Sequence, residues 1–206
     1  MTSTLTTAEP RSGHVRSVAD THPIDLDGAA RAVHDLLRAL GRDTSSKHLA
    51  DTPRRAAAAF AELLTPEPFE FTTFPNDEGY DQLVLVRDIP FRSLCEHHLL
   101  PFGGVAHVGY LAEHRILGLS KLARIVNRFA SDLQTQERLT KQVADWLDCH
   151  LGPRGVGVVI EADHSCMSLR GVRATGVLTV TSALHGALRD HARSRQEFFA
   201  LTRTQR

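Results

Sequence analysis

Three side chains of the kinds that bind metal ions lie far apart in this chain, and any fold must bring them together. Cys95 and His98 are spaced C-x-x-H, and Cys166 follows much later. Two thiolates and an imidazole are a ligand set typical of zinc. Three protein ligands leave the fourth tetrahedral position to water, as in catalytic zinc sites. We therefore expect a catalytic zinc centre that joins two distant segments.

Two further histidines, His97 and His164, adjoin these residues in the sequence. An imidazole beside a metal is a natural group for moving protons. The alternative is a structural zinc knuckle whose fourth ligand the sequence does not reveal. Glu96 and His97 count against a knuckle, because a purely structural site has little use for ionisable neighbours.

Composition restricts the class of protein and its partners. The 206 residues are enough for one domain with its own core, and the formal net charge is zero. Nothing in that charge favours nucleic acid or an anionic membrane as a partner. Residues 1–22 lack an apolar leader, and no run is long enough to span a bilayer, so we expect a cytoplasmic protein. Three cysteines do not indicate a disulfide framework, and we expect Cys149 to be a small core residue in a helix.

Hydrophobic periodicity divides the chain into three parts: a disordered tail over 1–22, a helical arm over 23–66 and a catalytic domain over 67–206. Apolar residues at helical spacing predict a helix from Leu26 to Leu40, which Gly41 ends. Thr52-Pro53 is a good start for a second helix, and Thr65-Pro66 closes it.

In the domain, the patterns predict strands over 69–74, 83–87 and 105–111, then helices over about 120–130 and 135–151. A further strand begins at Val156 and has a hairpin partner over 177–181. If it continues to Cys166, then His164 and Cys166 lie on one face of it. This order of elements predicts an α+β fold with a mostly antiparallel sheet.

A second group of residues suggests an anionic substrate. Ser120 and Lys121 open a helix, where free backbone N–H groups and the helix dipole favour an anion. Arg124 and Arg128 share a face with Lys121, and Arg170 follows the last zinc ligand. We expect a substrate with phosphates. The alternatives are an ordinary solvated helix surface here, and simple first-turn capping for Gln136-Glu137 at the next helix.

Several separate motifs, in order, resemble GTP cyclohydrolase I from about residue 26 to 201. They are Thr52-Pro53-Arg54-Arg55, Ser93-Leu94-Cys95-Glu96-His97-His98, Gly118-Leu119-Ser120-Lys121-Leu122, Gln136-Glu137-Arg138-Leu139-Thr140, His164-Ser165-Cys166, Arg170-Gly171-Val172-Arg173 and 179–182. The resemblance implies a tunnelling fold, in which two helices back an antiparallel sheet, with an N-terminal helical arm. It also implies a toroidal homodecamer with active sites between subunits.

The resemblance also assigns roles to residues. It implies zinc bound by Cys95, His98 and Cys166, with His97 and His164 as catalytic histidines. Glu137, helped by Gln136, reads the guanine edge, where a carboxylate can accept from N1–H and the exocyclic amine. The implied contacts to ribose and triphosphate are Ser120, Lys121, Arg124, Arg170 and, from a neighbouring subunit, Arg55.

The implied reaction converts GTP to formate and 7,8-dihydroneopterin triphosphate, at the start of folate, other pterin or deazapurine biosynthesis. Zinc supplies an activated water that adds to C8 of guanine while His164 protonates N7. A second hydrolysis releases formate. His97 assists ribose opening before Amadori rearrangement and ring closure.

The chain departs from the family pattern over 132–135, where Asp-Leu-Gln-Thr replaces Arg-Pro-Gln-Val, and over 174–176, where Ala-Thr-Gly replaces an often charged segment. Loss of the proline is expected to loosen the turn that aims Glu137. Two rival functions remain. One is another tunnelling-fold enzyme for pterins or deazaguanines, such as a nitrile reductase with a nucleophilic cysteine; Cys95 and Cys166 as paired ligands argue against it. The other is a non-catalytic, zinc-stabilised assembly.

Overall fold

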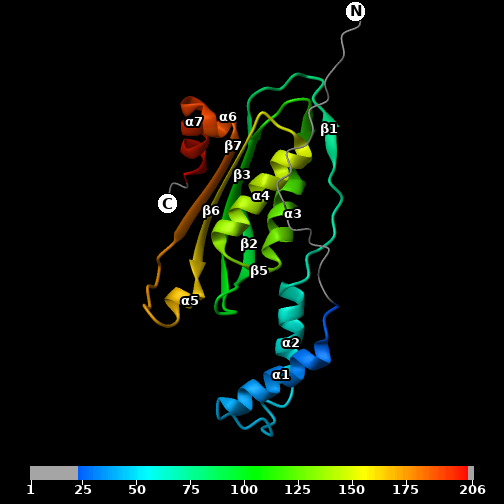
Figure 1. Cartoon of the computed structure of the whole chain (residues 1–206), viewed down its shortest axis with the longest axis vertical. Coiled ribbons are helices and arrows are strands. Elements are labelled where there is room, and N and C mark those ends of the chain that lie inside the picture. The colour runs from blue at the N-terminus through cyan, green and yellow to red at the C-terminus, as the bar shows by residue number, and fades with distance from the viewer. Residues whose placement is uncertain (1–22, 204–206) are drawn as a thin grey trace, which may run out of the picture.

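The computed structural model describes residues 23–203 and shows a two-helix arm that extends from a sheet-and-helix body (Figure 1). Helices α1 (Leu26–Ala39) and α2 (Thr52–Leu63) form the arm, as the periodicity predicted. The Asp25 side chain caps α1 by accepting from the Gly28 N–H, and Gly41 follows it with a positive φ of 74°. The N-cap of α2 is Asp51 rather than Thr52. The tail predicted over 1–22 lies outside the described residues.

The body is built on a five-stranded sheet in the order β5-β2-β3-β6-β7. These strands are β5 (Leu133–Gln134), β2 (Leu83–Cys95), β3 (Pro101–Leu111), β6 (Gly155–His164) and β7 (Thr179–Gly186). All neighbours are antiparallel except β5, which pairs parallel with the end of β2. A two-stranded sheet joins β1 (Thr73–Pro75) to β4 (Arg115–Leu117). The prediction of a strand over 69–74 is therefore wrong except at its last two residues, which begin β1.

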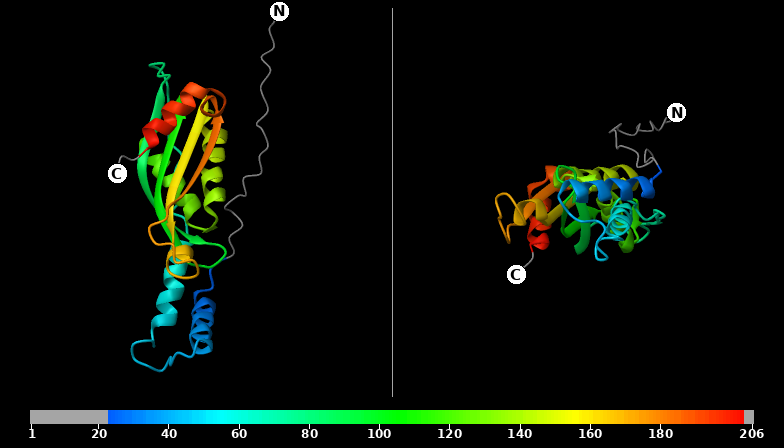
Figure 2. Two further views of the ribbon diagram at one scale, coloured as in Figure 1. Left: turned by 90° about the vertical axis from the view of Figure 1, so that its left-hand side faces the viewer. Right: turned by 90° about the horizontal axis from the view of Figure 1, so that it is seen from below.

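Two helices cover one face of the sheet, namely α3 (Leu119–Ala130) and α4 (Gln136–Leu151). The alternate residues Val156, Val158 and Ile160 of β6 face these helices and are fully buried. The intervening residues face the other side, where α6 (Ala187–Asp190) and α7 (Ala192–Thr202) pack over one end of the sheet (Figure 2). The α+β fold, with an antiparallel sheet backed by two helices, is confirmed.

Strand direction places both metal-binding segments at one end of the sheet. Strands β2 and β6 both run antiparallel to β3, so they run in the same direction. Their last residues, Cys95 and His164, therefore lie at the same end of the sheet. The condition under which His164 and Cys166 would share one face of a strand, namely that β6 runs on to Cys166, is not met. The strand ends at His164, and Cys166 lies in the short helix α5 (Ser165–Ser168).

Two other features bear on the predictions. Cys149 is exposed, so its expected place in the core is wrong. It lies on α4 two residues after buried Leu147, and two residues correspond to about 200° of helix rotation. Among the described residues, no helix combines the length and apolar character needed to cross a membrane.

Candidate active site

The three predicted zinc ligands converge. The ligand atoms of Cys95, His98 and Cys166 all lie within 4.8 Å of one another, and Cys95 Sγ is 3.8 Å from His98 Nδ1. Tetrahedral zinc, with bonds of about 2.0–2.3 Å, holds its ligand atoms roughly 3.3–3.8 Å apart. The three atoms are thus close to the spacing that zinc requires. Within residues 23–203 the group has three members, which leaves one tetrahedral position without a protein ligand.

The chemistry of the donors also favours a cation. Burial raises the pKa of the Cys166 thiol, the adjacent Cys95 raises it further, and Arg170 opposes the rise. Two thiolates side by side repel each other, and a divalent cation between them removes that repulsion. The pair of cysteines therefore fits a metal better than two free thiols.

The metal loop, defined here as residues 95–98, is held by backbone and side-chain contacts. The Cys95 N–H donates to the Leu100 carbonyl, and the Glu96 N–H donates to the Gln134 carbonyl in β5. An ion pair of 2.6 Å joins the Glu96 carboxylate to the Arg138 guanidinium on α4. The sequence analysis gave Arg138 no role; a cation three residues after the N-cap of α4 offered no local signal that it reaches Glu96.

The His164 imidazole is held on two sides at the end of β6. Its ring stacks on Phe102, with centroids 4.6 Å apart and planes 5° apart, and its Nε2 lies 2.8 Å from Gln136 Oε1. Burial lowers the pKa of His164, while Glu137 and Asp163 raise it. The ring is therefore neutral around pH 7, and it lies two residues before Cys166, a member of the metal-binding group formed by Cys95, His98 and Cys166.

His97 lies on the outer side of the metal loop. Its side chain is exposed, with Nδ1 3.9 Å from Cys95 Sγ and Nε2 3.9 Å from a Glu96 carboxylate oxygen. This position leaves the ring free to meet a substrate from the solvent side.

The first turn of α4 brings Gln136 and Glu137 to the same end of the sheet, because β5 directly precedes it and pairs with the end of β2. Glu137 is exposed, whereas Gln136 is buried. The segment that lacks the family's proline is hydrogen bonded: the Leu133 N–H donates to the Asp132 carboxylate, and Thr135 caps α4.

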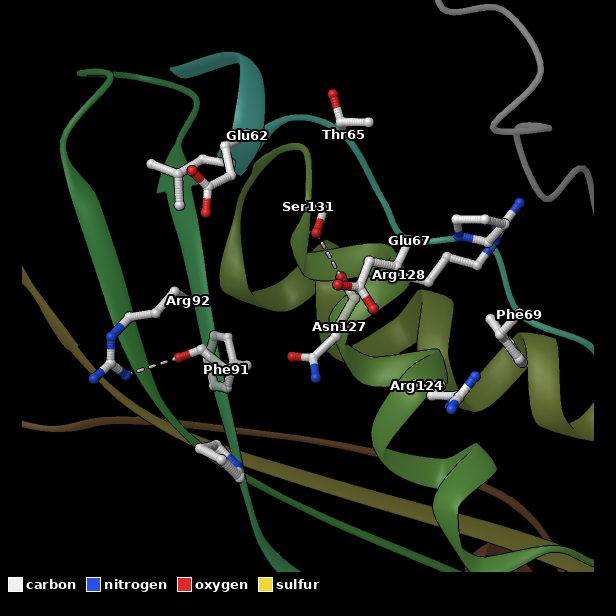
Figure 3. A pocket seen from close by; sticks show the side chains of 13 residues that line it. Glu62, Thr65, Glu67, Phe69, Phe91, Arg92, Arg124, Asn127, Arg128 and Ser131 are labelled. Atoms are coloured by element: carbon white, nitrogen blue, oxygen red, sulfur yellow. Dashed lines mark hydrogen bonds between the residues drawn. The ribbon is translucent and has the colours of Figure 1, made fainter. Parts of the chain in front are cut away.

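The predicted phosphate contacts do not gather at the metal group of the same chain. Ser120 and Lys121 lie in the first turn of α3, next to β4, at the end of the helix away from β5. Arg124 lines a pocket of about 550 Å³ with Arg92 and other residues of β2, α3 and the arm (Figure 3). No member of the metal loop lines this pocket.

The other two predicted phosphate contacts, Arg55 and Arg170, lie on the helical arm and beside Cys166 respectively. Arg55 lies on α2 and pairs with Asp51 at 3.0 Å. Arg170, which is exposed, is close enough to Cys166 to lower the pKa of that thiol. Of the predicted phosphate contacts, only Arg170 therefore stands at the metal end.

Known proteins match the chain over most of its length. The family model for GTP cyclohydrolase I matches residues 29–203. The GTP cyclohydrolase 1 of Aquifex aeolicus is 47% identical over 180 residues, which cover 87% of this chain and 98% of that protein. The GTP cyclohydrolase 1 of Streptomyces avermitilis is 49% identical over 199 residues, with 88% and 98% covered. For that of Mycobacterium ulcerans the identity is 48% over 182 residues, with 86% and 90% covered. The chain therefore belongs to the GTP cyclohydrolase I family.

Proposed function

We propose that this protein is a zinc-dependent enzyme that converts GTP to 7,8-dihydroneopterin triphosphate and formate, the first step of a folate or pterin pathway. The observation that carries the proposal is the three-membered group of Cys95, His98 and Cys166, whose ligand atoms lie within 4.8 Å of one another. A neutral, oriented imidazole beside that group supplies a proton-transfer residue. Membership of the family identifies the substrate.

In this proposal Cys95, His98 and Cys166 hold the zinc. Zinc, when bound, would lower the pKa of a coordinated water from its bulk value to about 7. His164 transfers a proton to guanine N7 while the imidazole ring of the base opens, and His97 assists proton movement at the ribose. Glu137 accepts from the guanine N1–H and amine, which a carboxylate can do with its two oxygens. Arg170 stabilises phosphate charge near the metal.

We further propose that the remaining phosphate contacts come from another copy of the chain. Ser120 and Lys121 lie at the end of α3 away from β5. Arg124 lines a pocket that also holds Arg92 and Arg128 beside Glu62 and Glu67, a net positive charge of one, and that contains no residue of the metal loop. A site assembled from two copies would unite this pocket with the zinc group of a neighbour. Arg55, on the projecting arm, would reach such a shared site from a third position.

The edges of the sheet and the arm support assembly into a ring, which we propose to be the toroidal homodecamer. In the described sheet β7 has no neighbour on its outer side, and β5 covers only Leu94 and Cys95 of β2. Such open edges pair readily with another strand. The arm exposes Leu26, Leu36 and Leu40, apolar side chains that a second copy would bury. We place the enzyme in the cytoplasm, because its substrate is a cytoplasmic nucleotide, with no nucleic acid or membrane as partner.

The test is to incubate the zinc-loaded protein with GTP and to measure formate and, after oxidation, the fluorescence of the pterin. Both products should form, and Cys166→Ser should lose zinc and both products together. Zinc-loaded protein that releases no formate would refute the enzyme and leave the non-catalytic zinc assembly. Formate without pterin would refute the complete reaction and indicate an enzyme that stops after ring opening.

A further inference from the structure

We infer that Gln136 is a positioning residue that holds His164 as the tautomer protonated on Nε2, so that Nδ1 is the nitrogen that exchanges a proton with the substrate. The inference rests on the proposed function and assigns Gln136 a different task from reading guanine. It depends on the direction of each hydrogen bond around one buried amide.

The orientation of the Gln136 amide follows from its partners. The side chain is buried, with 2% exposed, and its Nε2 lies 3.0 Å from the Ile160 carbonyl and 2.9 Å from the Thr179 carbonyl. Backbone carbonyls only accept hydrogen bonds, so the amide nitrogen must face them. An amide oxygen in that place would meet two carbonyl oxygens with no proton between them. The oxygen Oε1 is therefore the atom that faces His164.

The orientation of the amide in turn fixes the proton on the imidazole. Gln136 Oε1 lies 2.8 Å from His164 Nε2, and an amide oxygen carries no proton, so Nε2–H is the donor. A neutral imidazole has one proton, which leaves Nδ1 as the unprotonated nitrogen. The stack on Phe102 fixes the plane of the ring, and turning the ring over would break the bond to Gln136.

The proton balance of the step agrees with this arrangement. The neutral Nε2–H ring takes a proton on Nδ1 from the water that is consumed in the hydrolysis, and the hydroxide of that water adds to C8 of guanine. His164 then passes the Nδ1 proton to guanine N7 and returns to the neutral Nε2–H tautomer, which Gln136 already binds. Both donor hydrogens of the Gln136 amide are occupied by the protein, with the Thr181 hydroxyl 3.1 Å away as a further acceptor. The amide therefore has no donor left for guanine.

This inference separates the kinetic effects of two adjacent residues. Gln136→Met keeps a similar volume but removes the acceptor, and it should lower kcat at least about 10-fold, because a catalytic histidine in the wrong tautomer is a poor proton carrier. The KM for GTP and the zinc content should stay within about twofold of the wild type. Glu137→Gln should instead raise the KM. Thr181→Val is the matched control: it removes a hydroxyl that contacts the same amide but leaves the bond to His164, and kcat should be retained.

A spectroscopic measurement tests the tautomer without substrate. In protein labelled with nitrogen-15 at histidine, the ring signals that disappear in His164→Ala belong to His164. They should report the Nε2–H tautomer in the wild type and a mixture of tautomers in Gln136→Met.

A wild-type ring protonated on Nδ1 would overturn the inference, as would a Gln136→Met enzyme with raised KM and normal kcat. If zinc-loaded wild type released no formate, the proposed function would fail, while the tautomer measurement would still decide the assignment of Gln136.

Discussion

Replacing Arg138 with alanine should weaken zinc binding without changing a zinc ligand. The Arg138 guanidinium donates to Glu96 in the metal loop at 2.6 Å, to Gln134 Oε1 at 2.9 Å and to the Leu133 carbonyl. It therefore ties the loop between Cys95 and His98 to β5 and α4. Alanine at this position removes all three contacts and leaves the Glu96 carboxylate without its arginine.

The expected size follows from the exposure of the pair. The Arg138 and Glu96 side chains are 41% and 31% exposed, so water screens the charges and the pair contributes less than a buried one. Loss of a group that orients metal ligands typically costs 10- to 100-fold in metal affinity. Because of the exposure we expect the lower limit, about 10-fold, which corresponds to about 1.4 kcal/mol.

The assay is the rate at which zinc passes from the loaded protein to a coloured chelator. Lys141→Ala is the matched control, because Lys141 lies on the same helix and its side chain is 70% exposed, but its ion pair is with Asp145 rather than with Glu96 of the metal loop. Zinc should leave Arg138→Ala about 10-fold faster, and Lys141→Ala should release it like the wild type. If Arg138→Ala released zinc at the wild-type rate, or if both variants released it equally fast, Arg138 would not be the residue that holds the metal loop in place.

Two further predictions concern stability. A methyl group on Gly104 would lie 1.9 Å from the Glu161 carbonyl oxygen on the strand that leads to His164, whereas one on Gly109 would lie 3.1 Å from its nearest atom. In urea unfolding, Gly104→Ala should therefore cost roughly 3 kcal/mol or more and Gly109→Ala below about 1, and equal costs would contradict the packing described. His107 is fully buried, its Nε2 has no hydrogen-bond partner among the described residues, and burial lowers its pKa. The unfolded chain then binds a proton more readily, so the free energy of unfolding should fall as pH drops below about 6.5, and His107→Gln should flatten that slope; unchanged slopes would refute it.

Local patterns in the sequence were enough to predict the elements whose apolar residues recur regularly. On α3 the buried residues Leu122, Ile125, Val126 and Phe129 follow helical spacing, and the helix lies where the sequence analysis expected it. The convergence of Cys95, His98 and Cys166 was predicted from chemistry, since a C-x-x-H pair and one distant cysteine can share one metal ion.

The elements that sequence analysis missed depend on tertiary contacts. Helix α7 buries only Phe198 and Thr202, too few apolar positions for a periodic signal. The Phe198 ring lies against the backbone of Gly157, where a Cβ atom would come within 2.7 Å of the ring. Cys149 was assigned to the core because it lies in a helical pattern with Trp146 and Leu147, but the buried face of α4 does not include it. The missed helix depends on a contact that a linear pattern does not record, whereas the spacing of Cys149 from Leu147 already turns it away from the buried face.

The positions of the predicted site residues support the proposal that the reaction takes place between copies of the chain. Lys121 stands about nine residues before the end of α3 that adjoins β5, which is roughly 14 Å of helix. Arg124 lines a pocket that contains no residue of the metal loop. Because α3 and α4 both pack against the sheet, these groups keep their separation from Glu137 and His164 within one chain. We therefore propose that a GTP in contact with all of them lies between copies, and a variant that keeps its fold and zinc but stays monomeric should keep Cys95, His98 and Cys166 together without a complete triphosphate site.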